Sequence, residues 1–260
     1  RQQITAYMQN LRKEIEMVSE HLDSSRLVTQ IHWGGGTPNS IPLKEVEEVM
    51  NLLYDKFSLS ERPEIAMECS PAYLQPNDVV RLHEIGFNRL SLGIQDFNGE
   101  LLKKLNRKPS RYPVEEIYRI AKETGYKGVN FDLMYGLPDQ TLDDHIRSVQ
   151  NAIDIGPERI VTFSYAHVPW FKEHQKKLET YHLPKPEEKL EMLESSFDLL
   201  TRNGYRAIGM DHYAKENDEL SLAWQNKTLQ RNFQGYCTRE TTGQVYAFGA
   251  TAISQLTDGY

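Results

Sequence analysis

The sequence predicts an α/β fold with a parallel sheet, and two observations support this prediction. Short apolar runs rich in β-branched residues alternate with segments in which apolar residues recur every three or four positions. A single helical segment separates most consecutive strand candidates, and this order is typical of parallel strands joined by right-handed crossovers. An open doubly wound sheet and a barrel both fit such a pattern.

The predicted elements follow one another along most of the chain. The first helix is expected over residues 4–21 and the first strand over residues 27–33, which ends in the consecutive glycines 34–36. Gly204 is a natural stop for the last predicted helix. Further strands are expected at 64–67, 87–94, 126–133 and 159–164, and further helices at 46–57, 78–84, 112–124, 142–154 and 187–202.

The end of the chain fits this alternation less well. Residues 209–230 are irregular and polar, whereas residues 246–253 look buried again. We therefore divide the chain into an α/β core at residues 1–204 and an appended segment at residues 205–260. We expect the appended segment to fold back onto the sheet, to complete one side of the core and to contribute to a substrate site.

Composition restricts the class of protein. The chain has 260 residues, 39% of them hydrophobic and 26% charged, which is ordinary for a globular protein. No run approaches the roughly 18 apolar residues that span a bilayer, and the first residues lead into a helix without a signal-peptide core. We expect a cytoplasmic protein with no membrane partner. The net charge of −7 argues against a nucleic-acid partner.

Cys69 and Cys237 are the only cysteines of the chain. Two distant cysteines make neither a disulfide framework nor a metal-cluster motif. We therefore expect both to be free, buried thiols.

Polar residues follow the predicted strands at the points where the strands end. The carboxyl ends of parallel strands share one face, which carries the active site in such folds, so these residues should converge. Each of them could instead be a local turn or cap residue, but five successive strand ends of this kind favour a functional face. They are residues 34–37, Glu68, Gln95 with Asp96, Asp132, and residues 165–167.

Each residue type at these ends has a plausible chemical task. The glycines at 34–36 let backbone N–H groups approach a ligand closely, and Thr37 adds a hydroxyl. A partly buried Glu68 needs a cationic or hydrogen-bonding partner, such as the ammonium of an amino-acid-like ligand. Asp132 can accept hydrogen bonds from ribose hydroxyls or an amine, although a helix or loop cap is an equal alternative.

A basic island lies between two predicted elements. Such a concentration in an acidic protein suits an anionic ligand, because arginine can bind a carboxylate through two hydrogen bonds. For most of these residues a solvated helix face is the favoured interpretation. The island comprises Lys103, Lys104, Arg107, Lys108 and Arg111.

Five sequence blocks resemble a known family. Residues 32–38, His-Trp-Gly-Gly-Gly-Thr-Pro, are similar to the Gly-Gly-Thr-Pro variant of the glycine motif in radical S-adenosylmethionine enzymes. Residues 86–97 and 131–141 are similar to blocks shared by oxygen-independent coproporphyrinogen III oxidases and related haem chaperones. Residues 209–214 and 231–236 resemble the oxidases and not the chaperones.

The resemblance implies a partial (β/α)6 TIM-like barrel that lacks its first strand and its cluster loop. It implies a 4Fe–4S cluster, with ligands outside this chain, and two S-adenosylmethionine molecules at the barrel mouth. Phe233 and Gln234 are implied near the second molecule or the substrate. The implied contacts are Gly35, Glu68 and Ala166 for the first molecule, and Gly36, Thr37, Gln95, Arg107, Asp132 and Ile253 for the second. Arg107 is thereby separated from the solvated island as a carboxylate ligand.

The implied reaction is the oxidative decarboxylation of two propionate side chains of coproporphyrinogen III to vinyl groups, giving protoporphyrinogen IX in haem biosynthesis. A 5′-deoxyadenosyl radical would abstract a hydrogen atom from the propionate β-carbon, after which carbon dioxide and an electron leave. The protein's own part is positioning and the exclusion of water. An unidentified reductant and an unidentified electron acceptor are implied, and we expect a monomer.

The sequence departs from the family in one respect. The cluster motif, Cys-x3-Cys-x2-Cys, is absent, and neither Cys69 nor Cys237 stands in such a context. The simplest interpretation is an internal portion of a longer protein that is not catalytic by itself. The alternative is a natural homologue without a cluster.

Two other functions remain as hypotheses. A haem-binding or haem-trafficking protein on the same barrel is opposed by the blocks at 209–214 and 231–236. A degenerate barrel that only binds S-adenosylmethionine or a nucleotide is opposed by Glu68, which is intact like the other implied contacts. His167 and His212 are expected to be hydrogen-bonded or to face the substrate, and not to bind a metal.

Overall fold

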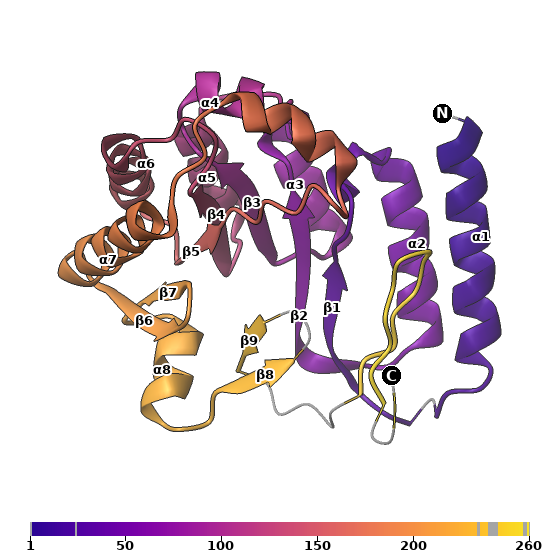
Figure 1. Cartoon of the computed structure of the whole chain (residues 1–260). Coiled ribbons are helices and arrows are strands. Elements are labelled where there is room, and N and C mark those ends of the chain that lie inside the picture. Colours follow the sequence, from indigo (N-terminus) through magenta and orange to yellow (C-terminus); the bar gives the residue numbers. More distant parts are fainter. Residues whose placement is uncertain (1, 24, 233–234, 239–243, 257–258, 260) are drawn as a thin grey trace.

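The structure is a computed structural model that describes residues 2–23, 25–232, 235–238, 244–256 and 259. Its centre is a seven-stranded sheet in the order β1-β2-β3-β4-β5-β7-β6 (Figure 1). The first five strands are parallel, which confirms the predicted sheet. They are β1 (Val28–Trp33), β2 (Leu59–Cys69), β3 (Arg89–Gln95), β4 (Gly128–Tyr135) and β5 (Arg159–Ser164).

The six longest described helices pack along the sheet. Figure 1 shows them along the right, the back and the left of the curved sheet. All six were expected from the spacing of apolar residues. They are α1 (Gln2–Ser19), α2 (Leu43–Lys56), α3 (Pro76–Ile85), α5 (Val114–Thr124), α6 (Leu142–Ile155) and α7 (Pro186–Arg202). None of the described helices is both long and apolar enough to cross a membrane.

Local sequence fixes where these helices begin and end. At the start of α6, the Thr141 hydroxyl accepts a hydrogen bond from the Asp144 N–H at 3.1 Å, and the Asp144 carboxylate accepts one from the Thr141 N–H at 3.0 Å. This reciprocal capping satisfies backbone donors that the first turn leaves unpaired. Helices α3 and α5 each stop at a left-handed glycine, Gly86 with φ 120° and Gly125 with φ 108°.

Short elements occupy the strand ends and were not anticipated by the sequence. The helix α4 (Gly99–Lys104) follows β3. Three 3-10 turns accompany it, namely η1 (Pro38–Ser40), η2 (Pro71–Tyr73) and η3 (Glu173–Thr180). With three to eight residues, such elements are too short to show a helical period.

The expectation of an irregular segment at 209–230 is wrong. After β6 (Tyr205–Gly209), β7 (His212–Lys215) lies between β5 and β6 and pairs antiparallel with both. The helix α8 (Glu219–Gln225) follows, and then a separate hairpin of β8 (Gln230–Asn232) and β9 (Gly235–Cys237). The sheet therefore continues past residue 204, and the division of the chain at that point stays a prediction.

The expected burial of residues 246–253 is also wrong, because Tyr246 is 36% exposed and Ile253 is 50% exposed. Within this segment the ring of Phe248 packs against Phe57, with centroids 6.5 Å apart. The Gly249 N–H donates to the Glu14 carboxylate at 3.1 Å. The segment thus lies beside α1 and α2, and its apolar residues alternate between these contacts and solvent.

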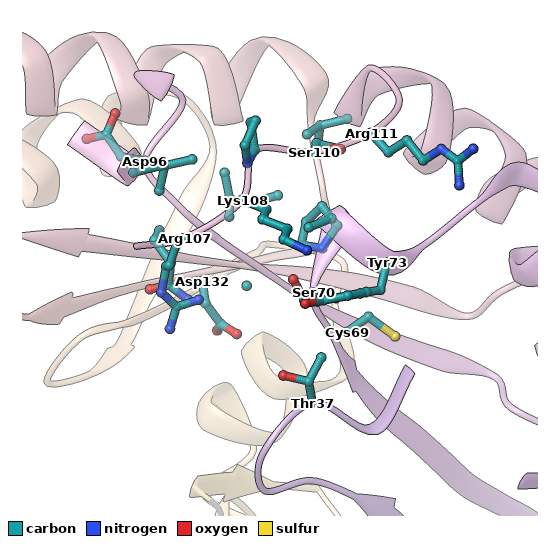
Figure 2. A pocket seen from close by; sticks show the side chains of 18 of the residues that line it. Thr37, Cys69, Ser70, Tyr73, Asp96, Arg107, Lys108, Ser110, Arg111 and Asp132 are labelled. Atoms are coloured by element: carbon teal, nitrogen blue, oxygen red, sulfur yellow. The ribbon is translucent and has the colours of Figure 1, made fainter. Parts of the chain in front are cut away.

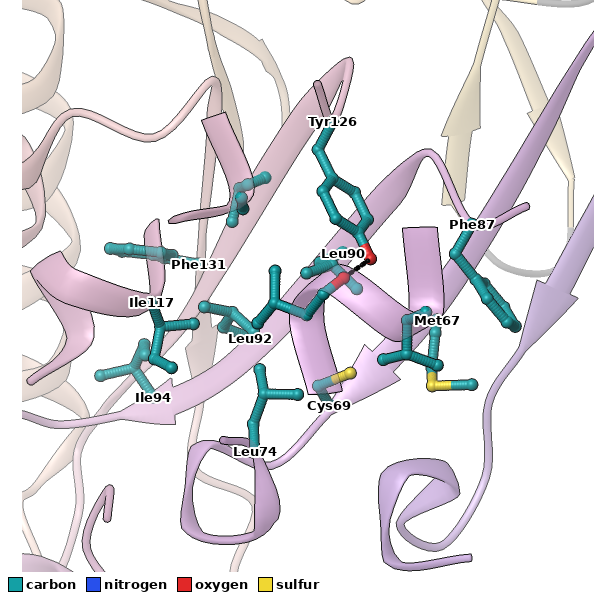
Figure 3. Close-up of a cluster of buried hydrophobic side chains, with 14 of the residues drawn as sticks. Met67, Cys69, Leu74, Phe87, Leu90, Leu92, Ile94, Ile117, Tyr126 and Phe131 are labelled. Atoms are coloured by element: carbon teal, nitrogen blue, oxygen red, sulfur yellow. Dashed lines mark hydrogen bonds between the residues drawn. The ribbon is translucent and has the colours of Figure 1, made fainter. Parts of the chain in front are cut away.

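Side chains alternate between the two faces of each strand. In β3, Leu90, Leu92 and Ile94 pack into the core between sheet and helices (Figure 3). Ser91, between the first two, faces the other side and bonds to Asp132. Cys69 lies in the same core as a free thiol with 3% exposure, as predicted, and burial raises its pKa. The side chain of Cys237 lies outside the described structure.

A charged network closes the concave side at the start of the strands. Arg89 Nε lies 2.7 Å from Glu64 Oε2, and Arg89 Nη2 lies 3.0 Å from Glu219 Oε2. Arg159 Nε donates to Asp218 Oδ1 at 2.9 Å, and Asp218 also caps α8. Because Arg89, Arg159 and Asp218 are largely removed from water, each needs its partner. The network therefore fixes α8 against the starts of β3 and β5.

A buried histidine joins α6 to α7. His145 is fully buried, and its Nε2 lies 2.6 Å from the Ser196 hydroxyl. Its Nδ1 has no hydrogen-bond partner among the described residues. Burial lowers the pKa of His145 to about 4, because the charged form would lose its hydration.

We expect His145→Gln to flatten the pH dependence of the free energy of unfolding. The unfolded chain binds a proton at the ordinary histidine pKa of 6.5, whereas the folded protein resists it down to about 4. The stability from neutral His145 is therefore present above pH 6.5 and lost as the pH falls towards 4, by on the order of 3 kcal/mol. Urea denaturation across this range measures it. The control His182→Gln replaces an exposed histidine and should leave the pH dependence of the free energy of unfolding unchanged. If wild type and His145→Gln show the same pH dependence, the lowered pKa of His145 is contradicted.

Candidate functional site

A cleft of about 930 Å³ opens at the carboxyl ends of the parallel strands (Figure 2). The structure brings residues from four strand ends and from the loop between α4 and α5 into its lining. Among the predicted contact residues, those that line it are Gly36, Thr37, Glu68, Gln95, Arg107 and Asp132. Except for Glu68, all of them belong to the set that the family resemblance assigns to a second S-adenosylmethionine.

The glycine turn after β1 wraps around Glu68. A Cβ atom on Gly34 would lie 2.8 Å from Glu68 Oε1, so a side chain there would displace the Glu68 carboxylate. Gly36 has φ 62° and is required for its backbone conformation. The His32 ring lies 3.0 Å from Glu68 Oε1, and this hydrogen bond, assisted by the Gly35 N–H, holds the pKa of Glu68 below its ordinary value. Glu68 is therefore an ionised carboxylate, half exposed to the cleft.

Asp132 is held by its neighbours on the concave side of the sheet. Its Oδ2 accepts a hydrogen bond from the Ser91 hydroxyl at 2.8 Å, and its Oδ1 accepts one from Asn130 Nδ2 at 2.7 Å. Burial raises the pKa of Asp132, and the two hydrogen bonds oppose that rise. A carboxyl group placed in this way can accept further hydrogen bonds from ligand hydroxyls or amines.

Gln95 stands in a strained backbone conformation. Its φ of 67° lies in the left-handed region, which is costly for a residue with a side chain, and the β3–β4 register shifts between Leu92 and Gln95. The missing side chain of Gly93 leaves space for the Gln95 amide, because a Cβ there would lie 3.0 Å from Gln95 Nε2. Strain of this kind persists at binding sites when the surrounding structure imposes it.

Asp96 has a structural task, although it follows Gln95 directly. It is 1% exposed and accepts hydrogen bonds from the Ser148 hydroxyl at 2.7 Å, Gln140 Nε2 at 2.8 Å and the Asn98 N–H at 2.6 Å. Burial raises its pKa against these bonds. Asp96 therefore ties the end of β3 to α6 and to the loop before α6, and its carboxylate points away from the cleft (Figure 2).

The basic island is divided by the structure. Lys103 and Lys104 belong to α4 and form ion pairs with Glu100 and Asp139, both at 2.6 Å. The remaining three cations lie in the loop between α4 and α5 and line the cleft. The prediction that Lys108 and Arg111 lie on a solvated helix face is therefore wrong. They are separated from the helix because α4 ends at Lys104 and the chain turns through Asn106, with φ 54°.

Three predicted contacts do not line this cleft. Gly35 belongs to the glycine turn after β1. A Cβ atom on Gly35 would lie 3.7 Å from Thr251 Oγ1, so the segment before Ile253 runs along this turn. Ala166 follows β5, and its carbonyl accepts a hydrogen bond from Gln175 Nε2 at 3.1 Å. Phe233 and Gln234 lie outside the described residues.

His212, expected from the sequence to be hydrogen-bonded or to face the substrate, lies on the concave side of the sheet. In the sheet register, Asp132 of β4 pairs with Val161, and Val161 pairs with His212 of β7. Neighbours in one row of a sheet point to the same face, so His212 and Asp132 face the same side of the sheet. His212 Nδ1 lies 2.7 Å from Asp211 Oδ1. His167 is likewise hydrogen-bonded, with Nδ1 3.3 Å from the Tyr165 hydroxyl.

Strand alternation is the signal that identifies the site residues that sequence reasoning missed. His32, Ser91 and Asn130 each stand between two apolar residues of their strand, as Glu68 and Asp132 do. A strand buried on both faces is expected to be apolar throughout, so regularly spaced polar residues indicate a polar lumen.

Comparison with known proteins decides the family. The sequence matches the model of the radical SAM superfamily over residues 5–152, which is more than half of the chain. This chain belongs to the radical SAM superfamily. S-adenosylmethionine and a 4Fe–4S cluster are the cofactors of this superfamily.

Relatives with a known activity match almost the whole chain. It is 39% identical to the oxygen-independent coproporphyrinogen III oxidase of Synechocystis and 40% identical to that of Pseudomonas aeruginosa, over 99% and 98% of the chain. It covers 55% of each relative, so it spans little more than half of their length. The solved coproporphyrinogen III oxidase of Escherichia coli, a radical SAM enzyme, aligns with a TM-score of 0.94 at 36% identity, over 98% of this chain and 58% of that one.

The residues of the cleft fit S-adenosylmethionine better than they fit an iron–sulfur cluster. Gly36 provides an uncrowded turn, Arg107 a guanidinium for a carboxylate, and Asp132 acceptors for hydroxyls. The described part of the chain has no group of three or more His, Cys, Asp or Glu side chains that could hold a metal. Cys69 is buried in the core, so the described residues provide no site for the 4Fe–4S cluster.

We expect Gln95→Asn to weaken S-adenosylmethionine binding about tenfold while the free energy of unfolding changes by less than about 1 kcal/mol. Asparagine adopts the left-handed region readily, so the backbone is kept, but its amide is one methylene shorter. Calorimetric titration measures binding, and urea denaturation measures stability. Gln150→Asn, on the outer side of α6, is the control. If the Gln95→Asn protein is destabilised but binds S-adenosylmethionine normally, Gln95 serves packing and not binding.

Proposed function

We propose that this chain forms most of the catalytic barrel of an oxygen-independent coproporphyrinogen III oxidase. The observation that carries the proposal is the similarity to such oxidases along 98–99% of the chain, with a TM-score of 0.94 to one of them. The substrate would be coproporphyrinogen III, and the product protoporphyrinogen IX of haem biosynthesis. The named relatives are oxidases, which favours this function over a haem chaperone.

Contacts between distant blocks support the same proposal. Described residues of the two blocks that resemble the oxidases, 209–214 and 231–236, meet beside β7. The ring of Tyr236 packs edge-on against His212, with centroids 5.2 Å apart, and its hydroxyl occupies the space left by the missing side chain of Gly209. His212 of one block and Tyr236 of the other therefore lie together, and His212 stands in the same row as Asp132.

We propose two S-adenosylmethionine molecules at this face. Glu68, Gly35 and Ala166 would contact the first, and Glu68 as an ionised carboxylate suits its ammonium. The contacts of the second would be Gly36, Thr37, Gln95, Arg107, Asp132 and Ile253, and all of these except Ile253 line the cleft. Arg107 suits its carboxylate, and Asp132 suits its ribose hydroxyls or amine. Phe233 and Gln234 are proposed near the second molecule or the substrate.

This chemistry requires the protein to position the reactants and does not require it to transfer a proton. When bound and reduced, S-adenosylmethionine supplies a 5′-deoxyadenosyl radical that can remove a hydrogen atom from a propionate β-carbon. The propionate then loses carbon dioxide and one electron to become a vinyl group, so no general acid or base is needed. Glu68, Gln95, Arg107 and Asp132 would orient the cofactors, and the walls of the cleft would keep water from the radical.

The remaining participants belong to the same proposal. Each decarboxylation releases an electron, so an electron acceptor is required, and cleavage of S-adenosylmethionine requires a reductant. The cluster ligands would lie outside this chain. We also retain the expectation of a cytoplasmic monomer that acts without a membrane or nucleic-acid partner.

The test uses the full-length protein, reconstituted anaerobically with iron and sulfide and supplied with S-adenosylmethionine, a reductant and coproporphyrinogen III. We expect protoporphyrinogen IX and 5′-deoxyadenosine to form together. Deoxyadenosine without protoporphyrinogen would indicate a radical enzyme with another substrate or a chaperone. Neither product from a protein with an intact cluster would overturn the catalytic proposal.

In the same assay we expect Arg107→Gln to lower turnover at least tenfold, because the cofactor carboxylate loses its guanidinium partner. The matched variant is Arg119→Gln on α5, whose guanidinium is exposed and paired with Glu123 at 2.7 Å. It should retain wild-type turnover. Equal activity of the two variants would remove Arg107 from the site.

A further inference from the structure

Three cations on one wall of the cleft have no anionic partner in the described part of the chain. Arg107, Lys108 and Arg111 come from the loop between α4 and α5 and line the cleft (Figure 2). No ion pair or side-chain hydrogen bond joins their charged groups to a described residue. Lys103 and Lys104, only a few positions earlier, both have carboxylate partners. We call Arg107, Lys108 and Arg111 the cation wall.

The loop that carries the cation wall is stiffened by its own sequence and contacts. Pro109 and Pro113 restrict its backbone, and the Ser110 hydroxyl donates to the Tyr112 carbonyl at 2.6 Å. The Arg107 N–H donates to the Leu102 carbonyl at 2.9 Å, which fixes the loop to the end of α4. The cations are thus presented by a constrained segment, which lowers the entropic cost of binding an anion.

Aromatic rings accompany the two outer cations. Lys108 Nζ lies 5.5 Å from the centre of the Tyr73 ring, and the Arg111 guanidinium lies 5.8 Å from the centre of the Tyr112 ring. Both tyrosines also line the cleft. Such contacts hold a cation loosely and leave its N–H groups available to an anion. This part of the cleft therefore combines flat apolar surface with positive charge.

The charges imply a ligand with several carboxylates. In a chain of net charge −7, three neighbouring cations without an anion repel one another, and this repulsion is relieved when an anionic ligand binds. The proposed function gives Arg107 one carboxylate, that of S-adenosylmethionine. Lys108 and Arg111 are then left without a partner.

We propose that Lys108 and Arg111 bind carboxylates of the tetrapyrrole substrate, those of the propionates that are not being decarboxylated. The inference rests on the proposed function and concerns the residues that bind its substrate. Coproporphyrinogen III carries four propionates, and one at a time must reach the S-adenosylmethionine molecules proposed at this face. The macrocycle then extends towards Tyr73 and Tyr112, and its remaining carboxylates reach the outer cations.

The number of carboxylates on the tetrapyrrole falls as the reaction proceeds. Each turnover removes one carboxylate, so the monovinyl intermediate carries three and the divinyl product two. Because Lys108 and Arg111 hold carboxylates that do not react, they retain the intermediate for the second decarboxylation. The product has one carboxylate fewer to bind and leaves more easily.

The binding test uses the full-length protein and coproporphyrin III, the stable oxidised form of the substrate, followed by its fluorescence. The double variant Lys108→Gln with Arg111→Gln should raise the Kd about tenfold. The control, Lys103→Gln with Arg119→Gln, removes the same charge from the flanking helices and should change the Kd less than twofold. The tetramethyl ester of coproporphyrin III has no carboxylate charge, and all three proteins should bind it equally.

The turnover test uses the reconstituted full-length enzymes. We expect the cation-wall double variant to release a larger fraction of the tricarboxylic monovinyl intermediate than wild type does. Its basal formation of 5′-deoxyadenosine without substrate should be unchanged, since Lys108 and Arg111 do not contact S-adenosylmethionine in this proposal. A loss of folding would instead reduce the formation of 5′-deoxyadenosine and of the intermediate together.

Two results would overturn the proposal: an unchanged Kd for coproporphyrin III in the double variant, or an equal loss of affinity in the control. The first would show that Lys108 and Arg111 do not touch the ligand, and the second that only overall charge matters. Failure of the proposed function has a different signature. The wild-type protein would then form no protoporphyrinogen, while the comparison of the acid with its ester still decides whether the cation wall binds carboxylates.

Discussion

The pleat of five parallel strands is the constraint on which the molecule depends. Successive side chains of a strand must point to opposite faces, so one set packs against the helices and the other lines the concave side. Parallel pairing also brings all the carboxyl ends to one edge, and Glu68, Gln95 and Asp132 meet there although the chain separates them widely. Core packing and site geometry therefore follow from the same backbone arrangement.

The arginines at one end of the concave side are paired with carboxylates, whereas no described carboxylate pairs with those at the other end. At the start of the strands, Arg89 and Arg159 have carboxylate partners at 2.7 and 2.9 Å, and the network fixes α8 in place. At the other end, Arg107 and its neighbours in the cation wall have no such partner among the described residues, and Gln95 keeps a strained backbone. Paired charges stabilise the fold, whereas unpaired charges and strain mark the end at which we propose that a ligand binds.

The long elements could be predicted because they are long. Each of the six main helices and five parallel strands repeats its period often enough to be visible, and Gly86 and Gly125 mark helix ends by their chemistry. The hairpin of β6 and β7 has strands of five and four residues, and α8 has seven, so no period can develop. Their positions are set by pairing with β5 and by the contacts of Asp218, which involve residues far away in the sequence.

The sequence by itself determined the class of fold, the polar residues at the strand ends and the family resemblance, because these depend on local pattern and on motifs. Only the tertiary structure decided which polar residues share the site. It turned Asp96 towards α6, put His212 in one row with Asp132, and separated the paired Lys104 from the cleft-lining Lys108. The physical reason is that a side chain's partner is set by the direction in which it leaves the backbone and by what the fold brings opposite to it, and neither is encoded in neighbouring residues.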